Sequence, residues 1–373
     1  MNERKSIEEL AHAYGVDIVH YMASTGLGSK ECMEKGCLAV SNNYYQPIPD
    51  LKELEKRGTW NKVSPMSGII WDDKTFMDTL SSLAEYSHEC DWPNEPGEDP
   101  IEFFINNGCF SYGCATALYC LIRKNKPQKI IEVGSGNSSC VIASALRKNM
   151  RENASCHAEY TIIDPYSNLN VDLFPKGTTV LRQPIELTDV CLFSNLSEND
   201  ILFIDSSHVS KIGSDVNFEI LDILPILKKG VFVHFHDIPM PYEYPPAYAY
   251  RLIPWFWTES YLLQAFLIGN SDYEVLLPMP YMQYNYEALF RELFPKGNQA
   301  VLWGSSSFWI KRLHDENDKI DSQQQLSEVQ AQVEQLAKQV LDYERTVHAY
   351  ENSTSWRVTK PIRAVKRLFS HRN

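Results

Sequence analysis

A short stretch near the middle of the chain constrains its fold more than any other. Residues 129–133 form a mostly apolar run that contains Glu132, and a Gly-Ser-Gly turn at residues 134–136 follows it directly. Glycine permits a tight turn and a close approach of the backbone to a ligand, and Asn137 or Ser138 can cap a following helix. The pattern predicts a strand, a ligand-binding turn and a helix in immediate succession.

This turn belongs to a longer alternation of apolar runs and helical patterns between about residues 101 and 312. The clearest helical patterns cover residues 138–148 and 214–227. Alternating strands and helices are typical of a doubly wound α/β fold with a mostly parallel sheet. We expect a seven-stranded Rossmann-like sheet with strands at residues 129–133, 160–164, 178–183, 201–205, 230–236, 273–277 and 306–312.

Composition and charge exclude several classes of protein. The 373 residues are 44% hydrophobic and 22% charged, as in a globular rather than a disordered chain. The net charge of −13 argues against a nucleic-acid partner, because binding phosphates requires a positive face. Nine cysteines without a Cys-x-x-Cys pair indicate reduced thiols and a cytoplasmic location. The polar N-terminus predicts no signal peptide, and the absence of long apolar runs predicts no transmembrane helix.

The chain divides by pattern into four expected parts. An irregular lead-in covers residues 1–100, the sheet domain 101–312, a heptad segment 320–352 and a basic tail 353–373. In the heptad segment, apolar residues recur at spacings of three and four, which is typical of a coiled coil. We therefore expect a homo-oligomer formed through residues 326–350. The alternative is a single amphipathic helix that packs on the core.

The tail differs in charge from the rest of the chain. All 48 acidic residues precede residue 353, whereas six of the 35 basic residues follow it. A helix beyond Pro361 would place Ile362, Val365, Leu368 and Phe369 on one face and basic residues towards the other. An interfacial helix on anionic lipid has this form. We expect residues 356–373 to attach the chain to the inner face of a cell membrane. A solvated, disordered end or a segment that binds a protein partner is the alternative.

Acids and imidazoles follow three further predicted strands. Asp164 ends the second strand, where an acid can accept both ribose hydroxyls of a nucleoside; a helix cap is the alternative. The fourth strand runs into Asp205-Ser-Ser-His208, and Asp215 lies in the next helical pattern. Parallel strands end at the same edge of a sheet, so these groups are expected to approach one another.

The fifth strand ends in the sequence His-Phe-His-Asp at residues 234–237. Strand alternation puts His234 and His236 on the same face. Together with Asp205 and Asp237, these groups could bind a divalent cation such as Mg²⁺ or act as a general base. Alternatively, they pair with one another and fix loops. The predicted catalytic residues are His208, His236, Asp205 and Asp215, and the predicted metal ligands are Asp205 and Asp237.

Together these motifs resemble those of the class I S-adenosylmethionine-dependent methyltransferases, in particular a bacterial branch with Asp-x-x-His and His-Asp motifs. The likeness covers about residues 100–312. It implies that S-adenosyl-L-methionine is the cofactor and that the residues bordering it are Glu132, Gly134, Ser135, Gly136, Asn137, Asp164 and Asp205. Metal-using relatives carry acids at the ends of strands four and five. Some of them have a carboxylate where this chain has His236.

The tail at residues 353–363 is similar to the ends of many bacterial surface-polysaccharide glycosyltransferases and methyltransferases. This resemblance implies a glycan or glycolipid-linked substrate, and we expect O-methylation of a sugar hydroxyl in a surface glycan or its precursor. His208 or His236 could be the base, with Asp215 or Asp237 orienting it, and Asp205 could serve either role. The aromatic-rich segment 242–257 is expected to stack on the sugar or to pack on the core. Two alternatives stay open. A nucleotide-sugar oxidoreductase is disfavoured because Ser139 replaces the expected Gly or Ala. The other is a non-catalytic scaffold that recruits a glycosyltransferase.

Overall fold

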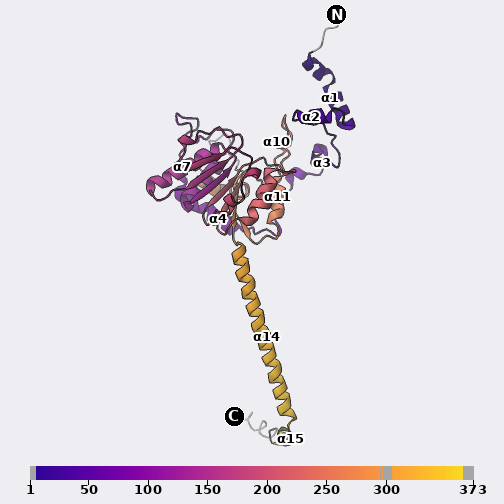
Figure 1. Cartoon of the computed structure of the whole chain (residues 1–373), viewed down its shortest axis with the longest axis vertical. Coiled ribbons are helices and arrows are strands. Elements are labelled where there is room, and N and C mark those ends of the chain that lie inside the picture. The colour runs from indigo at the N-terminus through magenta and orange to yellow at the C-terminus, as the bar shows by residue number, and fades with distance from the viewer. Residues whose placement is uncertain (1–5, 295, 297–304, 364–373) are drawn as a thin grey trace. The chain divides into compact units, whose positions relative to one another are not determined.

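The computed structural model describes residues 6–294, 296 and 305–363. The chain forms two compact units, residues 1–313 and residues 314–373 (Figure 1). The first unit holds the sheet and the candidate site, and the second holds the heptad segment and the tail. Each is described by itself below.

The first unit contains a seven-stranded sheet in the order β3-β2-β1-β4-β5-β7-β6, as counted in the described residues. Its strands are β1 (Lys129–Val133), β2 (Glu159–Ile163), β3 (Thr178–Leu181), β4 (Ile201–Ile204), β5 (Phe232–Phe235), β6 (Tyr273–Pro278) and β7 (Phe308–Arg312). The neighbours from β3 to β5 pair in parallel, and β7 pairs antiparallel with both β5 and β6. The predicted fold class, a mostly parallel doubly wound α/β sheet, is confirmed.

The register of the parallel strands brings their carboxyl ends to one edge. Val133 at the end of β1 pairs with Ile163 of β2 and with Ile204 of β4, which in turn pairs with Phe235 of β5. The residues that directly follow these strands therefore lie along the same edge of the sheet, where ligands bind in this class of fold.

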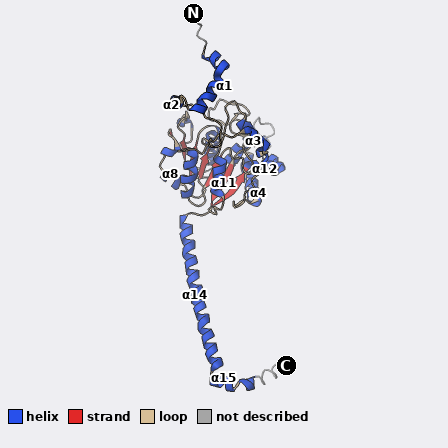
Figure 2. Cartoon of the chain, turned by 90° about the vertical axis from the view of Figure 1, so that its right-hand side faces the viewer, coloured by secondary structure: helices blue, strands red, loops and turns tan. Residues whose placement is uncertain are grey.

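Helices lie on either side of the sheet (Figure 2). Strands β4 and β5 are completely buried, as expected for parallel strands covered on both faces. The long helices are α6 (Tyr112–Asn125), α7 (Asn137–Glu152) and α11 (Glu259–Leu267). Shorter helices are α8 (Cys191–Ser194), α9 (Asp215–Phe218), α10 (Pro246–Ala249), α12 (Met279–Asn285) and α13 (Glu287–Leu293).

The helix predicted at residues 214–227 is much shorter than expected. Helix α9 ends at Phe218, a π-helical turn covers Glu219–Ile223, and a 3₁₀ turn covers Leu224–Ile226. Pro225 lacks a backbone N–H and cannot continue an α-helix. A π turn widens the helix locally and often lies at a functional site. Here it carries the buried Glu219, discussed below.

The lead-in consists of α1 (Ile7–Thr25), α2 (Ser29–Glu34), α3 (Leu51–Lys56), α4 (Asp73–Ser82) and α5 (Ala84–Ser87). Its later part belongs to the core of the first unit, because Phe76, Leu80 and Leu83 are fully buried. The N–H of Val275 in β6 also donates to the carbonyl of Ile70 at 3.2 Å. In contrast, α1 buries none of its residues.

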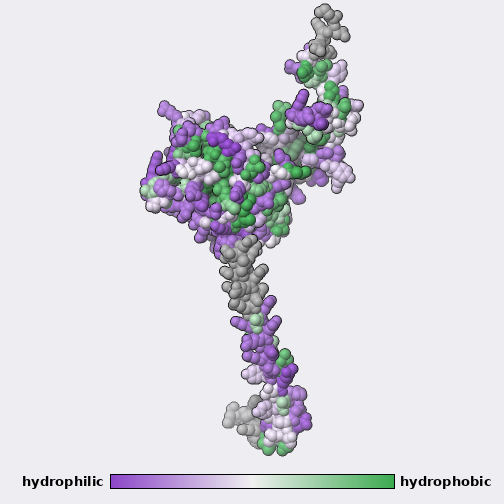
Figure 3. Space-filling model, in the orientation of Figure 1, coloured by the Kyte–Doolittle hydropathy of each residue, from purple (hydrophilic) through white to green (hydrophobic). Residues whose placement is uncertain are grey.

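The second unit consists of α14 (Glu316–Asn352) and α15 (Thr354–Val358). The side chain of Leu326, the first predicted seam residue, lies outside the described side chains. The later seam residues are largely exposed in the single chain; Val333 is 60%, Leu336 60% and Val340 55% exposed. The described part of α14 is otherwise mostly hydrophilic (Figure 3). Most of the predicted tail helix, at residues 364–373, lies outside the described residues.

Two further sequence predictions concern cysteines and membrane spans. All nine cysteines lie within the described residues, and each is a free thiol. Among the helices that the structure describes, none is long and apolar enough to cross a bilayer.

Candidate active site

The turn after β1 contains a glycine whose surroundings leave no room for a side chain. Gly134 has a φ of +82°, in the left-handed region, and its N–H donates to the carbonyl of Ile163 at 3.0 Å. A Cβ at this position would lie 2.2 Å from the carbonyl oxygen of Asp205. The turn therefore passes closely over the end of β4.

Glu132, predicted to border the cofactor, is instead buried beneath this turn. Its carboxylate accepts hydrogen bonds from Ser138 Oγ at 2.6 Å and Ser139 Oγ at 2.8 Å, and Tyr160 Oη also donates to it. Burial raises the pKa of Glu132 to about 7, although these three hydroxyl donors oppose the rise. Glu132 therefore fixes the first turn of α7 and lies below the ligand-facing surface.

A cavity of about 620 Å³ opens beside the turn, at the ends of β1, β2 and β4. Its lining includes four of the residues predicted to bind the cofactor: Gly134, Ser135, Asp164 and Asp205. Gly136 and Asn137 do not line it. Asp164 accepts hydrogen bonds from Ser135 Oγ and, at 2.8 Å, from the N–H of Tyr166. An accessible carboxylate at the end of the second strand fits the two hydroxyls of a ribose.

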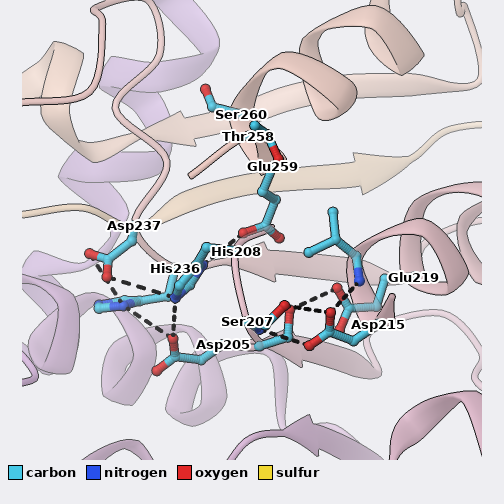
Figure 4. A network of polar contacts seen from close by, with 12 residues as sticks. Asp205, Ser207, His208, Asp215, Glu219, His236, Asp237, Thr258, Glu259 and Ser260 are labelled. Carbon is cyan, nitrogen blue, oxygen red and sulfur yellow. Dashed lines mark hydrogen bonds and ion pairs between the residues drawn. The ribbon is translucent and has the colours of Figure 1, made fainter. Parts of the chain in front are cut away.

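A network of acids and imidazoles lies at the ends of β4 and β5 (Figure 4). His208 is buried within it. Its Nε2 lies 3.3 Å from Asp205 Oδ1 and 3.9 Å from Asp237 Oδ2, and its Nδ1 lies 2.8 Å from Glu259 Oε2. The backbone N–H groups of Thr258 and Glu259 donate to the His208 carbonyl. The start of α11 thus holds both the backbone and the ring of this histidine.

His236 reaches the same two acids from the end of β5. Its Nδ1 lies 3.6 Å from Asp205 Oδ1 and 3.6 Å from Asp237 Oδ1, and its Nε2 lies 3.3 Å from Ser306 Oγ. His208 and Asp237 have left-handed backbones, with φ of +61° and +57°. Such strained non-glycine residues cost about 1–3 kcal/mol each and concentrate at functional sites.

The network favours the charged forms of its members. Burial alone would lower the pKa of His208, but hydrogen bonds to Asp205 and Glu259 raise it to about 10. The charges of Asp205 and Asp237 likewise raise the pKa of His236 well above its usual range, despite burial. Burial alone would raise the pKa of Asp205 and Asp237. The charge of His236 instead holds the pKa of both aspartates below the usual range. The imidazoles and carboxylates of the network therefore favour one another's charged forms.

The predicted metal site at Asp205 and Asp237 does not fit this arrangement. Divalent cations such as Mg²⁺ and Ca²⁺ are bound by carboxylate, carbonyl and water oxygens. Here each carboxylate lies within 3.9 Å of a ring nitrogen of both His208 and His236. Within residues 6–294, 296 and 305–363, no group of three or more His, Cys, Asp or Glu side chains is placed to hold a metal. His236, next to Asp237 in the chain, places its Nδ1 3.6 Å from a carboxylate oxygen of each of these two acids.

Two predicted members of the site have other roles. His234 is fully buried, stacks on Phe203 with ring centroids 4.0 Å apart, and places its Nε2 2.8 Å from Ser307 Oγ. Burial lowers the pKa of His234 well below its usual range, so it is a neutral core residue. Asp215, predicted to orient a histidine, instead accepts hydrogen bonds from Ser207 N–H at 2.8 Å and Ser207 Oγ at 2.6 Å. It fixes the loop after β4 and lines the first cavity.

Sequence reasoning missed two buried glutamates behind the network. Glu259 holds His208, and Glu219 accepts a hydrogen bond from Ser206 Oγ at 3.0 Å. Burial and the charge of Glu259 raise the pKa of Glu219 well above its usual range. No sequence signal distinguishes Glu259, because acids are common in the first turn of any helix.

A second cavity, of about 700 Å³, shares Asp205 with the first and is also lined by His236 and Asp237. The aromatic-rich segment 242–257 supplies much of its wall. The rings of Trp255 and Trp257 stack with centroids 4.8 Å apart and planes 8° apart. These rings therefore border an open cavity in addition to packing on one another.

The central part of this sheet is similar to a known protein family. Residues 131–238, from β1 to just past Asp237, match a family model described as a methyltransferase domain. A protein of Archaeoglobus fulgidus, itself described as uncharacterized, is 27% identical over 179 residues, which span 45% of this chain and 78% of that protein.

Two solved structures give distant matches. The apo-structure of CmcI-N160 has a TM-score of 0.31 and 12% identity, and the match covers 72% of this chain and 97% of that one. A Plasmodium falciparum protein described as a protein-L-isoaspartate O-methyltransferase, solved with S-adenosyl-L-homocysteine, has a TM-score of 0.25 and 12% identity, with coverages of 52% and 84%. Likenesses this distant say nothing about substrate.

Proposed function

We propose that this chain is an S-adenosylmethionine-dependent methyltransferase, as the match of residues 131–238 to a methyltransferase domain supports, and that it transfers a methyl group to a sugar hydroxyl in a surface glycan or its precursor. One observation carries the proposal: the cavity beside the glycine turn and the aromatic cavity meet at Asp205. A methyl donor in the first cavity and an acceptor in the second would therefore approach each other at a carboxylate. The methyltransferase match disfavours the oxidoreductase and scaffold alternatives.

The lining of the second cavity supports a sugar as the acceptor. Its aromatic wall, which includes Tyr248, Trp255 and Trp257, offers flat apolar faces, whereas His236 and Asp237 offer charged polar groups. A pyranose presents both C–H faces and hydroxyls, and pockets of this mixed kind orient their ligands through a few polar groups. An entirely apolar acceptor could not form hydrogen bonds with this polar end of the cavity.

The first cavity fits the proposed donor. Gly134 lines the cavity while its backbone packs closely against Asp205, and the Asp164 carboxylate is placed for a ribose. When bound, S-adenosylmethionine supplies a sulfonium methyl group: the new oxygen–carbon bond forms as the carbon–sulfur bond breaks, and sulfur takes the electron pair.

Asp205 is the residue best placed to take the proton that leaves the hydroxyl. It lines both cavities, and its side chain is 33% exposed. The hydroxyl becomes much more acidic as its oxygen bonds to carbon, so its proton can pass to the neighbouring carboxylate as the methyl group is transferred. His208 and His236, the other bases considered from sequence, both have a raised pKa and are less suited to accept a proton. They form ion pairs with Asp205 at 3.3 and 3.6 Å and fix its position.

Replacing Asp164 tests the donor cavity. We expect Asp164→Ala to weaken binding of S-adenosyl-L-homocysteine about 10- to 100-fold, because hydrogen bonds to a charged group are lost. Titration calorimetry measures the dissociation constant. The matched control is Asp172→Ala, at an exposed acid outside the cavity, which should leave it unchanged. An unchanged dissociation constant in Asp164→Ala would remove this residue from the cofactor site.

The heptad segment is proposed to bind a second copy of the chain. In the single chain, Val333, Leu336 and Val340 leave more than half of their surfaces exposed, and their spacing of three and four matches the seam of a coiled coil. We expect the double variant Val333→Asp/Leu336→Asp to have the mass of a monomer, 42.9 kDa, in light scattering. The control Gln335→Asp/Lys338→Asp lies off the seam and should keep the wild-type mass. A monomeric wild type would refute the proposal.

Attachment of residues 356–373 to an anionic membrane stays a prediction. Of the basic residues expected on the polar face of this helix, Lys366 and Arg367 lie outside the described residues. Arg363 is described, and its guanidinium lies 3.5 Å from the ring centroid of Trp356.

A further inference from the structure

A smaller cavity adjoins the proposed acceptor cavity, and nothing above assigns it a role. We propose that it binds a second sugar residue of the acceptor, so that the enzyme methylates a glycan of at least two sugars rather than a free monosaccharide. This inference rests on the proposed function and names the substrate class more closely.

The smaller cavity, of about 210 Å³, lies between the lead-in and the aromatic segment. Pro47, Leu54 and Trp60 line it from the lead-in. Pockets that hold a whole ligand usually measure about 300–1,000 Å³. A cavity below this range is suited to one part of a ligand whose remainder lies elsewhere.

The lead-in is firmly joined to the aromatic segment, so the cavity is part of the fold. Val63 forms a β-bridge with Tyr242, and the N–H of Ser64 donates to the Pro241 carbonyl at 2.8 Å. Near the rim, Tyr250 Oη donates to a carboxylate oxygen of Glu55 at 2.6 Å. These contacts link residues nearly two hundred positions apart in the sequence.

The two acceptor-side cavities share one wall. Tyr244, Tyr248, Trp255 and Trp257 line both of them. Trp257 also packs against the His208 ring, with centroids 4.3 Å apart. A ligand that spans both cavities would therefore contact the same aromatic rings on its way to the catalytic network. This continuity indicates a single extended binding site.

The chemistry of the smaller cavity favours a sugar over a lipid chain. Its aromatic rings can pack against C–H groups, and Trp60 Nε1 is buried without a hydrogen-bond partner in the described part of the chain. A sugar hydroxyl can accept from this indole N–H. A hydrocarbon cannot, and an unsatisfied buried donor costs about 1–3 kcal/mol. Glu243 adds a carboxylate at the same wall.

The test uses the full chain, labelled S-adenosylmethionine, and glycans from the producing cells separated into single sugars and longer chains. We expect label to enter the longer chains, with kcat/KM at least tenfold above that for single sugars. Trp60→Ala should raise KM for the longer chains about tenfold and leave kcat and binding of S-adenosyl-L-homocysteine unchanged. Trp60→Phe, which keeps a ring but loses the N–H, should raise KM by a smaller factor.

The control is Tyr45→Ala. Tyr45 is an aromatic residue of the lead-in that is 90% exposed and does not line the cavity, so its replacement should leave KM unchanged. Thermal unfolding checks that each variant folds. If Trp60→Ala does not fold, the KM of Trp60→Phe decides the test. Equal kcat/KM for single sugars and longer chains, or an unchanged KM in a folded Trp60 variant, would overturn the second sugar site alone. Label in neither fraction would refute the proposed sugar acceptor and this inference together.

Discussion

Asp205→Asn is expected to lower kcat for methyl transfer by about 10²- to 10⁴-fold, the range found when a positioned acid–base group is removed. Asparagine has nearly the same shape, but it cannot take the proton from the acceptor hydroxyl. It also removes the negative charge that lies 3.3 Å from His208 and 3.6 Å from His236. Single-turnover measurements with labelled donor would report the chemical step directly.

Asp215→Asn provides the matched comparison. Asp215 also lines the first cavity, but its carboxylate binds Ser207. We expect this variant to change donor affinity more than kcat. If the two variants lowered kcat equally, Asp205 would have no special role in proton removal. If Asp205→Asn kept full activity, the proposed site itself would be wrong.

Gly134→Ala is expected to destabilise the fold strongly and to abolish donor binding. The added Cβ would lie 2.2 Å from the carbonyl oxygen of Asp205, and the left-handed backbone alone costs a non-glycine residue about 1–2 kcal/mol. The backbone cannot move away easily, since Gly134 N–H binds Ile163 and Asp205 N–H binds Val133, each at 3.0 Å. A loss of at least about 2 kcal/mol corresponds, for a folded unit of this size, to a fall in Tm of at least about 3 °C.

Gly136→Ala is the control for this effect. A Cβ at Gly136 would meet nothing within 4 Å, and its φ of 167° lies outside the left-handed region. We expect its Tm to stay close to that of the wild type in differential scanning calorimetry. A Gly134→Ala protein with wild-type Tm and donor affinity would contradict the close packing of this turn over β4.

The fold could be predicted because its signals are local and repeated. Each strand of the sheet is a short apolar run, and the glycine turn marks where β1 meets α7. The prediction of one continuous helix at residues 214–227 was wrong because hydrophobic periodicity does not reveal a π turn. Pro225 does indicate in the sequence that an α-helix cannot continue through this position. The short antiparallel pairing of β7 with β5 and β6 depends on tertiary contacts that no local pattern encodes.

The site was predicted in part, for reasons that differ by residue. Asp164, Asp205 and His236 follow strands directly, so topology alone brings them to the cavities. His234 shares the periodicity of His236, but the neighbouring Phe203 and Trp309 rings enclose it. Glu259 lies 51 positions from His208, and only the docking of α11 brings the two together.

The most direct test of the central claim is to follow a ¹³C-labelled methyl group from S-adenosylmethionine into glycans of the producing cells by nuclear magnetic resonance. The account predicts a new methyl carbon bonded through oxygen to a sugar carbon, formed by the wild type and reduced at least a hundredfold with Asp205→Asn. Label found on nitrogen, on a protein carboxyl group, or on no acceptor at all would contradict it.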